Sequence, residues 1–253
     1  MKMRYACQMD GVELDSLAPS LYVTDIAEAA PAADHSVVAL AGGGRRILRD
    51  DRASLVVTVT FVIREYDVTR RKAVCQAVAA WAQGKYLSVN DRPGQRLRVA
   101  CSKLPVVRSA LRWTDSLTVE FTAWELPFWE SAQEVRVARS GSGTAELRFP
   151  GTMADSPLCA KLTASGSVNR VVIACGSQRY TLEHLGMVSG DVLTIGQDDR
   201  GLQFMRVNDR SVLACRTTDS SDEILLQPQA GNVIDLTADG SVAAVFSARG
   251  RWM

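Results

Sequence analysis

The residue types that most often carry acid–base or metal chemistry are scarce in this chain. Its 253 residues include two histidines, His35 and His184, which are too few for a histidine-rich metal site. His184 lies between Glu183 and Leu185 at the end of an expected strand, and no motif places a serine or cysteine nucleophile beside it. The GxSxG, HExxH and EF-hand patterns are missing. We expect a surface or hydrogen-bonded histidine at 184, and we predict that the protein is not an enzyme.

Three carboxylates, Asp191, Asp198 and Asp199, cluster around Gly190 and Gly196. Carboxylates at close spacing can bind Ca²⁺, but aspartate and glycine together are also the usual residues of turns. The spacing favours turns over a calcium loop. We therefore predict no metal site, no cofactor and no catalytic residue.

A glycine- and arginine-rich stretch from Gly42 to Arg52 is the most unusual part of the sequence. A phosphate-binding P-loop needs the pattern GxxxxGK[ST] between a strand and a helix, and this stretch lacks it. So many charged residues bury poorly, so we expect an exposed, mobile loop. Its guanidinium groups could bind carboxylates of a partner protein. The candidate contact residues are Arg45, Arg46, Arg49, Asp50, Asp51 and Arg52.

Four aromatic residues, Trp113, Trp124, Phe128 and Trp129, lie close together in the sequence. A platform that stacks on sugars or bases is conceivable. Packing in a core or between domains is the preferred interpretation, because the last three end a strand beside a proline.

The overall charge excludes a general nucleic-acid or membrane-surface binder. The formal net charge is +1, and neither half of the chain is strongly basic or acidic. The first residues lack the apolar core of a signal peptide, and no apolar run is long enough to span a membrane. None of the six cysteines lies in a CxxC pair, so we expect free thiols and synthesis in a reducing cytoplasm.

The stretch from Ser54 to Asn90 is expected to form a strand, a helix and a strand. Residues from Leu55 to Glu65 alternate between apolar and polar, as in a half-buried strand. A helix from Val68 to Gln83 should follow, with Asp67 as its N-cap and with Gly84 adopting a left-handed conformation at its end. Its expected buried face consists of Val74, Ala77, Val78 and Trp81. A second strand should run from Tyr86 to Asn90.

Short strands and turns are expected in the remainder of the chain. In the first half these are Tyr5–Met9, Leu21–Val23, Arg96–Lys103 after a type II turn at Asp91–Gly94, and Leu117–Ala123. In the second half they are Glu134–Ala138, Ala145–Phe149, Leu158–Ala164, Arg170–Cys175, Arg179–Glu183, Val192–Ile195, Leu202–Val207, Val212–Cys215, Glu223–Leu226, Val233–Leu236 and Val242–Ser247. Such closely spaced strands indicate an all-β sandwich. Pro127 cannot donate a backbone hydrogen bond and should therefore end the strand that precedes it. We place a domain boundary after Glu130, which gives domains 1–130 and 131–253.

The order of these features resembles the distal tail protein (Dit) family of tailed phages. The N-terminal residues that carry the resemblance are Tyr5–Gly11, Leu21–Ile26, the strand LVVTVTFVIRE, the helix with a tryptophan near its end, and the segments YLSVNDRPG, RLRVACSK and SLTVEFTAWELPFWE. In the second half, Pro157–Leu162 and Leu185–Ile195 look like strands of the family's galectin-like domain.

The resemblance implies a mainly β fold: an N-terminal β-sandwich-like domain with one α-helix, then a C-terminal galectin-like all-β sandwich. It also implies a virion structural protein of the tail tip or baseplate. Six copies would form a ring through the N-terminal domains and join the tail tube to the tip hub and to receptor-binding or fibre proteins. The arginine-rich loop would then lie at a subunit or tube interface. No nucleic acid or membrane partner is expected.

A carbohydrate-binding module of a host-adsorption apparatus is the alternative function. Sugar sites usually place a tryptophan or tyrosine opposite polar side chains, and the second half has only Tyr180 and Trp252. We therefore favour assembly over sugar binding.

Overall fold

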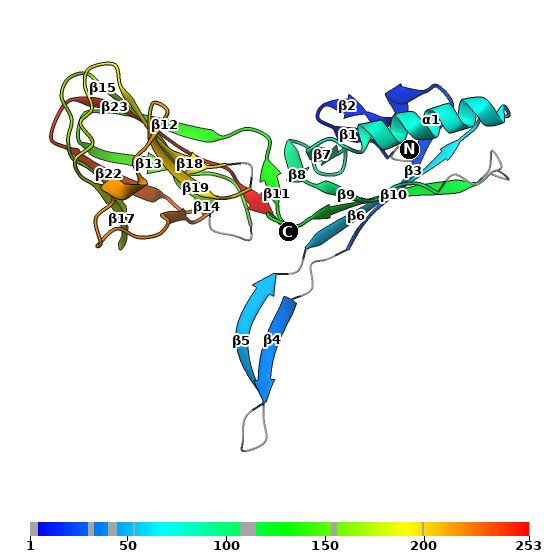
Figure 1. The fold of residues 1–253 in the computed structure, drawn as a ribbon, viewed down its shortest axis with the longest axis horizontal. Helices are drawn as coiled ribbons and strands as arrows, with labels where there is room; N and C mark the ends of the chain where they lie inside the picture. Colours follow the sequence, from blue (N-terminus) through cyan, green and yellow to red (C-terminus); the bar gives the residue numbers. More distant parts are fainter. Residues whose placement is uncertain are drawn as a thin grey trace. The chain divides into compact units, whose positions relative to one another are not determined.

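The computed structural model describes residues 5–29, 33–39, 45–52, 54–106, 115–152, 156–198 and 200–252, with the backbone alone in 33–39 and 45–52. These residues form mostly antiparallel strands, together with one α-helix and two short 3₁₀ helices (Figure 1). The predicted mainly β fold with a single helix is therefore confirmed. The chain divides into two compact units, Met1–Trp129 and Glu130–Trp252, which we call unit 1 and unit 2.

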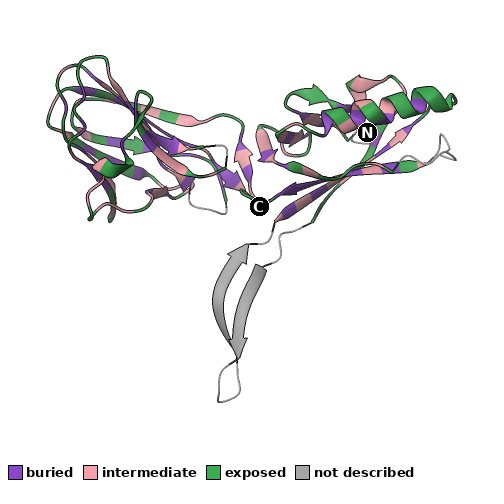
Figure 2. Ribbon diagram, viewed as in Figure 1, coloured by how far each residue is buried: buried purple, intermediate pink, exposed green. Residues whose placement is uncertain are grey.

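The main sheet of unit 1 has four strands in the order β3-β6-β10-β9. These are β3 (Leu21–Ala29), β6 (Leu55–Ile63), β10 (Ser116–Ala123) and β9 (Ala100–Lys103). Every second residue of β6 is buried, and Val59 lies opposite Val119 of β10. The predicted alternation of β6 and β10 is thus confirmed (Figure 2).

Short strands form a second sheet in unit 1, in the order β2-β1-β7-β8. These are β2 (Val12–Glu13), β1 (Cys7–Met9), β7 (Tyr86–Val89) and β8 (Gln95–Arg98). The 3₁₀ helix η1 (Leu14–Leu17) connects β2 to β3. The run predicted as one strand from Arg96 to Lys103 is divided at Val99 between the two sheets.

Helix α1 (Val68–Trp81) begins where the sequence indicated. The Asp67 carboxylate accepts a hydrogen bond of 2.9 Å from the backbone N–H of Arg70, and this bond lowers the pKa of Asp67. Trp81 packs edge-on against Phe121 of the main sheet, with ring centroids 5.8 Å apart. Its indole N–H donates to the Val12 carbonyl at 2.8 Å, so one side chain links the helix to both sheets.

The buried face of α1 differs from the prediction. Its buried residues are Arg71, Cys75, Val78 and Trp81. Val74 and Ala77, which the sequence placed inward, are only half-buried. The buried face combines the charged residue Arg71 with Cys75, Val78 and Trp81, so apolar periodicity gives only a weak signal for it.

The expectation for Gly84 is also wrong. Its φ angle is not positive, and the helix ends in a right-handed conformation at Ala82. A side chain at 84 would instead collide with Met9, whose Cγ lies 2.2 Å from the position of an added Cβ. Glycine is therefore required by the close approach of β1 and not by a left-handed cap.

Residues 45–52 form a strand, and the expected loop is wrong for them. Strand β5 (Arg45–Arg52) pairs with β4 (Ala33–Ala39) in an antiparallel ribbon with an irregularity at Ser36/Val37 (Figure 1). A sequence with charged residues at successive positions gives no period-two signal, so alternation could not reveal this strand. Gly42–Gly44 fall outside the described residues.

Unit 2 is a sandwich of a six-stranded and a four-stranded sheet. The first has the order β12-β23-β15-β18-β19-β20, namely Val135–Ser140, Val242–Ala248, Cys159–Ala164, Val192–Gln197, Gln203–Val207 and Arg210–Ser211. The second has the order β13-β22-β16-β17, namely Gly143–Leu147, Asn232–Ala238, Val171–Cys175 and Gln178–Leu182. A single apolar core that includes Phe246, Ile173 and Leu236 fills the space between them.

Most strands predicted for unit 2 overlap the observed ones. Val212–Cys215 is an exception, because it contains the 3₁₀ helix η2 (Leu213–Cys215). Only Val212 of this segment is buried, so a strand there would have no buried face. The short pair β14 (Ser156–Pro157) and β21 (Leu225–Leu226), together with β11 (Trp129–Ser131) and β24 (Arg251–Trp252), completes the described strands.

Candidate functional site

Three side chains of unit 1 form a compact cluster at the end of β3, just before the chain enters the β4–β5 ribbon. Arg92 donates two hydrogen bonds to the Glu28 carboxylate, at 3.1 Å and 3.0 Å. Its guanidinium also lies over the indole of Trp129, 5.1 Å from the ring centroid. The indole N–H of Trp129 donates to the same carboxylate at 3.0 Å. We call Glu28, Arg92 and Trp129 the root cluster.

The root cluster is well suited to fix the base of the ribbon. Trp129 is fully buried, and the side chains of Arg92 and Glu28 are 26% and 25% exposed. Partial burial strengthens a bidentate ion pair relative to one on the open surface, and the stacked ring adds a cation–π contact. The position of Glu28 on β3 is therefore determined by side chains from two distant parts of unit 1.

The main sheet of unit 1 has an open edge on each side. Among the described strands, β3 pairs only with β6, and β9 pairs only with β10. The Asp15 carboxylate accepts from the Val23 backbone N–H at 3.2 Å and covers the beginning of the β3 edge. Open strand edges are ready sites for pairing with another chain.

Trp124 is an exposed aromatic residue directly after β10. It is 67% exposed, so it does not pack in a core as the sequence analysis allowed. Arg98 and Glu125 form an ion pair beside it, and Leu126 completes the hollow that these residues line. An exposed tryptophan next to an arginine is typical of the central residues of protein interfaces. We call Trp124, Arg98, Glu125 and Leu126 the Trp124 patch.

The prediction of packing holds for the neighbouring aromatic residues that the structure describes. Trp129 is fully buried and Phe128 is half-buried. Trp113 falls outside the described residues.

The contact residues predicted from the sequence all lie on β5. These are Arg45, Arg46, Arg49, Asp50, Asp51 and Arg52. Their backbone pairs with β4, with Asp50 opposite His35 and Arg49 opposite Ser36. Their side chains fall outside the described residues, so their role in a contact stays a prediction. The root cluster and the Trp124 patch were not found from the sequence, although a tryptophan beside charged residues was a usable signal.

Comparison with known proteins gives a match in structure and none in sequence. No family model and no curated protein matches the chain. The structure of the SPP1 Dit (gp 19.1) protein, described as a paradigm of hub adsorption apparatus in Gram-positive infecting phages, superposes with a TM-score of 0.73 at 13% identity. That match covers 98% of this chain and 99% of the SPP1 protein.

The chain has the Dit fold.

Two further solved structures agree with this assignment. A chain of the phage P2 baseplate in its activated conformation with Ca gives a TM-score of 0.52 at 7% identity, covering 99% of this chain and 98% of that one. The corresponding structure with Sr gives 0.50 at 7% identity, with 97% of each chain covered. The resemblance to the Dit family that the sequence indicated is therefore confirmed at the level of the fold.

The histidine expected on the surface of this Dit fold is exposed. His184 follows β17 and has a positive φ of 59°. In the described part of the chain, no group of three or more histidine, cysteine, aspartate or glutamate side chains is placed to bind a metal ion. His35 lies on β4, and its side chain falls outside the described residues.

Asp191 and Asp198 accept hydrogen bonds from backbone N–H groups in turns, as their spacing predicted. The Asp191 carboxylate accepts from the Val188 backbone N–H and from the Asn208 amide, both at 2.9 Å, and these bonds lower its pKa. Asp198 accepts from the Leu202 backbone N–H at 2.9 Å. Asp199 falls outside the described residues.

All six cysteines of the chain are free thiols. They are Cys7, Cys75, Cys101, Cys159, Cys175 and Cys215. Burial raises the pKa of Cys7 to about 12, so this thiol remains protonated and unreactive at neutral pH.

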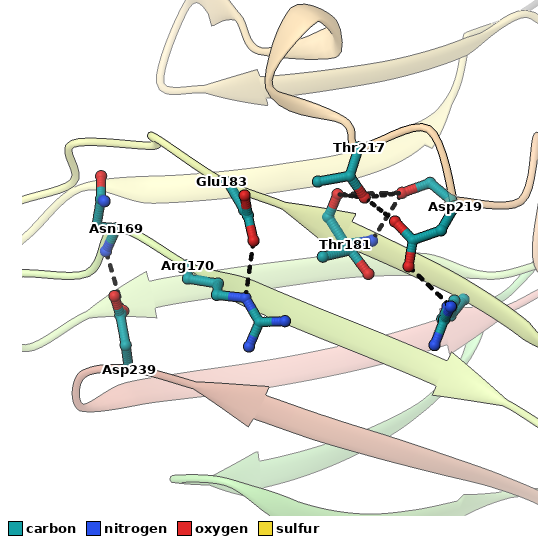
Figure 3. Close-up of polar contacts among 9 residues, drawn as sticks. Asn169, Arg170, Thr181, Glu183, Thr217, Asp219 and Asp239 are labelled. Atoms are coloured by element: carbon teal, nitrogen blue, oxygen red, sulfur yellow. Dashed lines mark hydrogen bonds and ion pairs between the residues drawn. The ribbon is translucent and has the colours of Figure 1, made fainter.

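A polar cluster joins the loop after η2 to the four-stranded sheet of unit 2 (Figure 3). Arg170 and Glu183 form an ion pair at 3.1 Å, and Arg179 and Asp219 form one at 2.8 Å. The Thr217 hydroxyl donates to Asp219, and this bond contributes most to lowering the pKa of that carboxyl. Each charge is neutralised by a neighbour in the cluster. These contacts hold the loop against the sheet.

Within the described ranges, no helix combines the length and apolar character needed to cross a bilayer. The positive charges of unit 1 that the structure describes are often paired, as Arg92 is with Glu28 and Arg98 with Glu125.

Proposed function

We propose that the protein is a structural hub of a phage tail or of a phage-derived tail. In this proposal six copies form a ring at the tail tip, which connects the tail tube to the tip hub and to receptor-binding or fibre proteins. The observation that carries the proposal is the match to the SPP1 Dit protein over nearly the full length of both chains. The protein acts by assembly in this role and has no catalytic step.

The open edges of the main sheet support a ring. A closed ring needs two different surfaces on each subunit, one of which contacts the other surface of the next copy. Strands β3 and β9 lie at opposite ends of one sheet, so they supply two such surfaces. The Trp124 patch follows β10, which is the neighbour of β9, and would add an aromatic anchor to the contact.

The β4–β5 ribbon supports a second contact, with the next subunit or with the tail tube. A two-stranded ribbon has two unpaired edges for backbone pairing, and β5 is rich in arginine. Arginine suits such interfaces because its planar group binds carboxylates through two hydrogen bonds. The root cluster would fix the direction in which the ribbon leaves β3.

Electron microscopy of the purified chain tests the proposal directly. Negative-stain images should show sixfold rings, and light scattering should give about six times the 27.5 kDa mass of one chain. A protein that stays monomeric at every concentration, and also when mixed with its tail tube protein, would contradict a hub role.

A further inference from the structure

The outer face of the six-stranded sheet in unit 2 has a groove that the proposed hub function leaves unused. The groove has a volume of about 500 Å³ and is lined by residues of β12, β23, β15, β18 and β19. This volume lies within the range of ordinary ligand sites. All of these strands are described in full.

The register of the sheet places a row of small side chains at the bottom of this groove. Arg136, Ser247 and Cys159 lie side by side on neighbouring strands, because Ser247 pairs with both of the others. On the far side Gly196 pairs with Phe204. Three small residues therefore form the centre of the row, between an arginine at one end and an aromatic ring at the other.

The glycine at 196 is needed for this shape. A Cβ there would lie 3.2 Å from the ring of Phe204 and 3.8 Å from the sulfur of Cys159. A larger residue would push the ring of Phe204 outward and raise the floor of the groove. The apolar C–H face of a pyranose ring could pack on an aromatic ring in this position.

The charge of the face identifies the kind of ligand. A second row, one step along the strands, places Lys161 next to Thr194 and Thr194 next to Arg206. The guanidinium of Arg206 stacks on Phe204 at 5.1 Å. In the part of the chain that the structure describes, neither Lys161 nor Arg206 forms an ion pair with a carboxylate. Arg136, 68% exposed, adds a third positive charge.

No acidic residue occurs in any of the six strands of this sheet. The four-stranded sheet of the same unit, in contrast, contains Glu146 and Asp235. One carboxylate, Glu134, lies at the end of the groove, and it already binds Arg136 at 3.2 Å and Arg249 at 2.9 Å. The face therefore presents a positive field with no competing acid at its centre.

We propose that this groove binds an anionic polysaccharide, whose carboxylate or phosphate groups contact Lys161, Arg206 and Arg136 while a sugar ring packs on Phe204. A sheet face offers side chains but no free backbone donors, because those are used in the ladder. An extended acidic peptide would bind more readily to a strand edge, where backbone hydrogen bonds are available. An aromatic ring flanked by cations on a low floor suits a charged sugar chain better.

Calorimetric titration of the full-length protein with four defined polymers tests this inference. The probes are polygalacturonate (carboxylate groups), phosphomannan (phosphate groups), neutral dextran and poly-glutamate. We expect at least one of the two anionic glycans to bind more tightly than dextran and poly-glutamate, with an affinity that falls as salt is raised. The glycan that binds identifies whether carboxylate or phosphate is recognised.

Matched variants separate this site from general electrostatic attraction. The double variant Lys161→Glu with Arg206→Glu should weaken glycan binding about tenfold or more at low salt, since both exposed charges change sign. Phe204→Leu should weaken it about threefold without changing the salt dependence. Arg148→Glu is the control, because Arg148 is 72% exposed and follows β13 of the other sheet, so it should bind like the parent.

Three results would overturn the inference. They are no binding of either anionic glycan, an equal loss in Arg148→Glu and in the double variant, and tighter binding of poly-glutamate than of both glycans. The last result would indicate an acidic protein segment as the occupant. The groove lies within one chain, so the result of the glycan titration does not depend on whether the protein forms rings.

Discussion

Arg92 stacks on Trp129 while both side chains bind the carboxylate of Glu28. The guanidinium carbon lies 5.1 Å from the indole centroid, and the three polar contacts to Glu28 measure 3.0–3.1 Å. Glu28 is the penultimate residue of β3, and the ribbon follows. One small network thus connects the end of an edge strand, a turn and the last residue of unit 1.

Arg92→Ala should destabilise unit 1 by about 1–2 kcal/mol, because the partly buried Glu28 carboxylate then loses two hydrogen bonds and the Trp129 ring loses its cation–π contact. Urea unfolding of the full chain, followed by tryptophan fluorescence, measures this cost. Arg92→Lys should recover only part of it, since an ammonium group cannot form the bidentate pair.

Arg64→Ala is a suitable control for the stacking alone. Its guanidinium lies 5.0 Å from the centroid of Tyr22 on the exposed face of the same sheet. We expect a change of about 0.5 kcal/mol or less there. Equal costs for Arg92→Ala and Arg64→Ala would show that the network with Glu28 contributes nothing beyond a surface contact.

Gly84→Ala should destabilise the protein by about 1–3 kcal/mol, because the new methyl group would overlap Met9 and approach Asp10. Asp10 accepts from the backbone N–H groups of Lys85 and Tyr86, so moving it also disturbs the pairing of β1 with β7. Thermal unfolding measures the effect. Gly166→Ala, where an added Cβ meets nothing within 4 Å, should change stability by less than about 0.5 kcal/mol.

Trp124→Ala should weaken association between copies by about tenfold or more while leaving the stability of the monomer nearly unchanged. The side chain is 67% exposed, so its removal creates no cavity, and exposed tryptophans at interfaces contribute strongly to binding. Analytical ultracentrifugation measures the association. The control is Leu202→Ala in unit 2, which is 63% exposed. Unchanged rings in Trp124→Ala would exclude the Trp124 patch from the subunit contact.

Replacement of the β4–β5 ribbon by a short Gly-Ser linker should prevent normal rings or their attachment to tail tubes. A milder variant, Arg45→Glu with Arg46→Glu and Arg49→Glu, reverses the charge of β5 and keeps its length. Electron microscopy of the variant mixed with tube protein provides the measurement. Intact rings joined normally to tubes in the ribbon replacement would rule out the contact role of this segment.

The sequence predicted those elements whose side chains alternate against a buried face. Strand β6 is the clearest case, because every second residue from Leu55 to Ile63 is apolar and buried. The β4–β5 ribbon carries polar residues along its length, and the buried face of α1 includes the charged residue Arg71, so apolar periodicity shows neither the ribbon nor this face. At Val212–Cys215 a short apolar run predicted a strand, but only Val212 is buried and a 3₁₀ helix forms instead.

The candidate sites were harder to predict because they combine residues far apart in the sequence. Glu28 and Arg92 are 64 positions apart, and Trp129 is 101 positions from Glu28. The groove of unit 2 needs the register of five strands, which the sequence alone does not give.

The loop after η2, which contains Thr217 and Asp219, should lose its protection against hydrogen exchange in acid. Hydrogen bonding from Thr217 and the nearby Arg179 charge lower the pKa of Asp219 from its ordinary value of 3.8. A carboxylate with a lowered folded-state pKa stabilises the fold at pH values above 3.8, and this stabilisation disappears as the pH falls through the lower folded-state value. Hydrogen exchange should therefore show protection of the Ser221 amide, which donates to the Arg179 carbonyl at 2.7 Å, at pH 5 and a progressive loss of this protection as the pH falls below 3.8.

Asp219→Asn should reduce this protection at neutral pH and remove most of its dependence on pH between 5 and 3, since an amide does not titrate in this range. Asp222→Asn is the matched control in the same loop, because the Asp222 side chain is fully exposed. It should retain the parental pH profile. Protection in Asp219→Asn that still falls with acid as in the parent would show that other carboxylates, such as Asp239 beside Arg170, hold the loop instead.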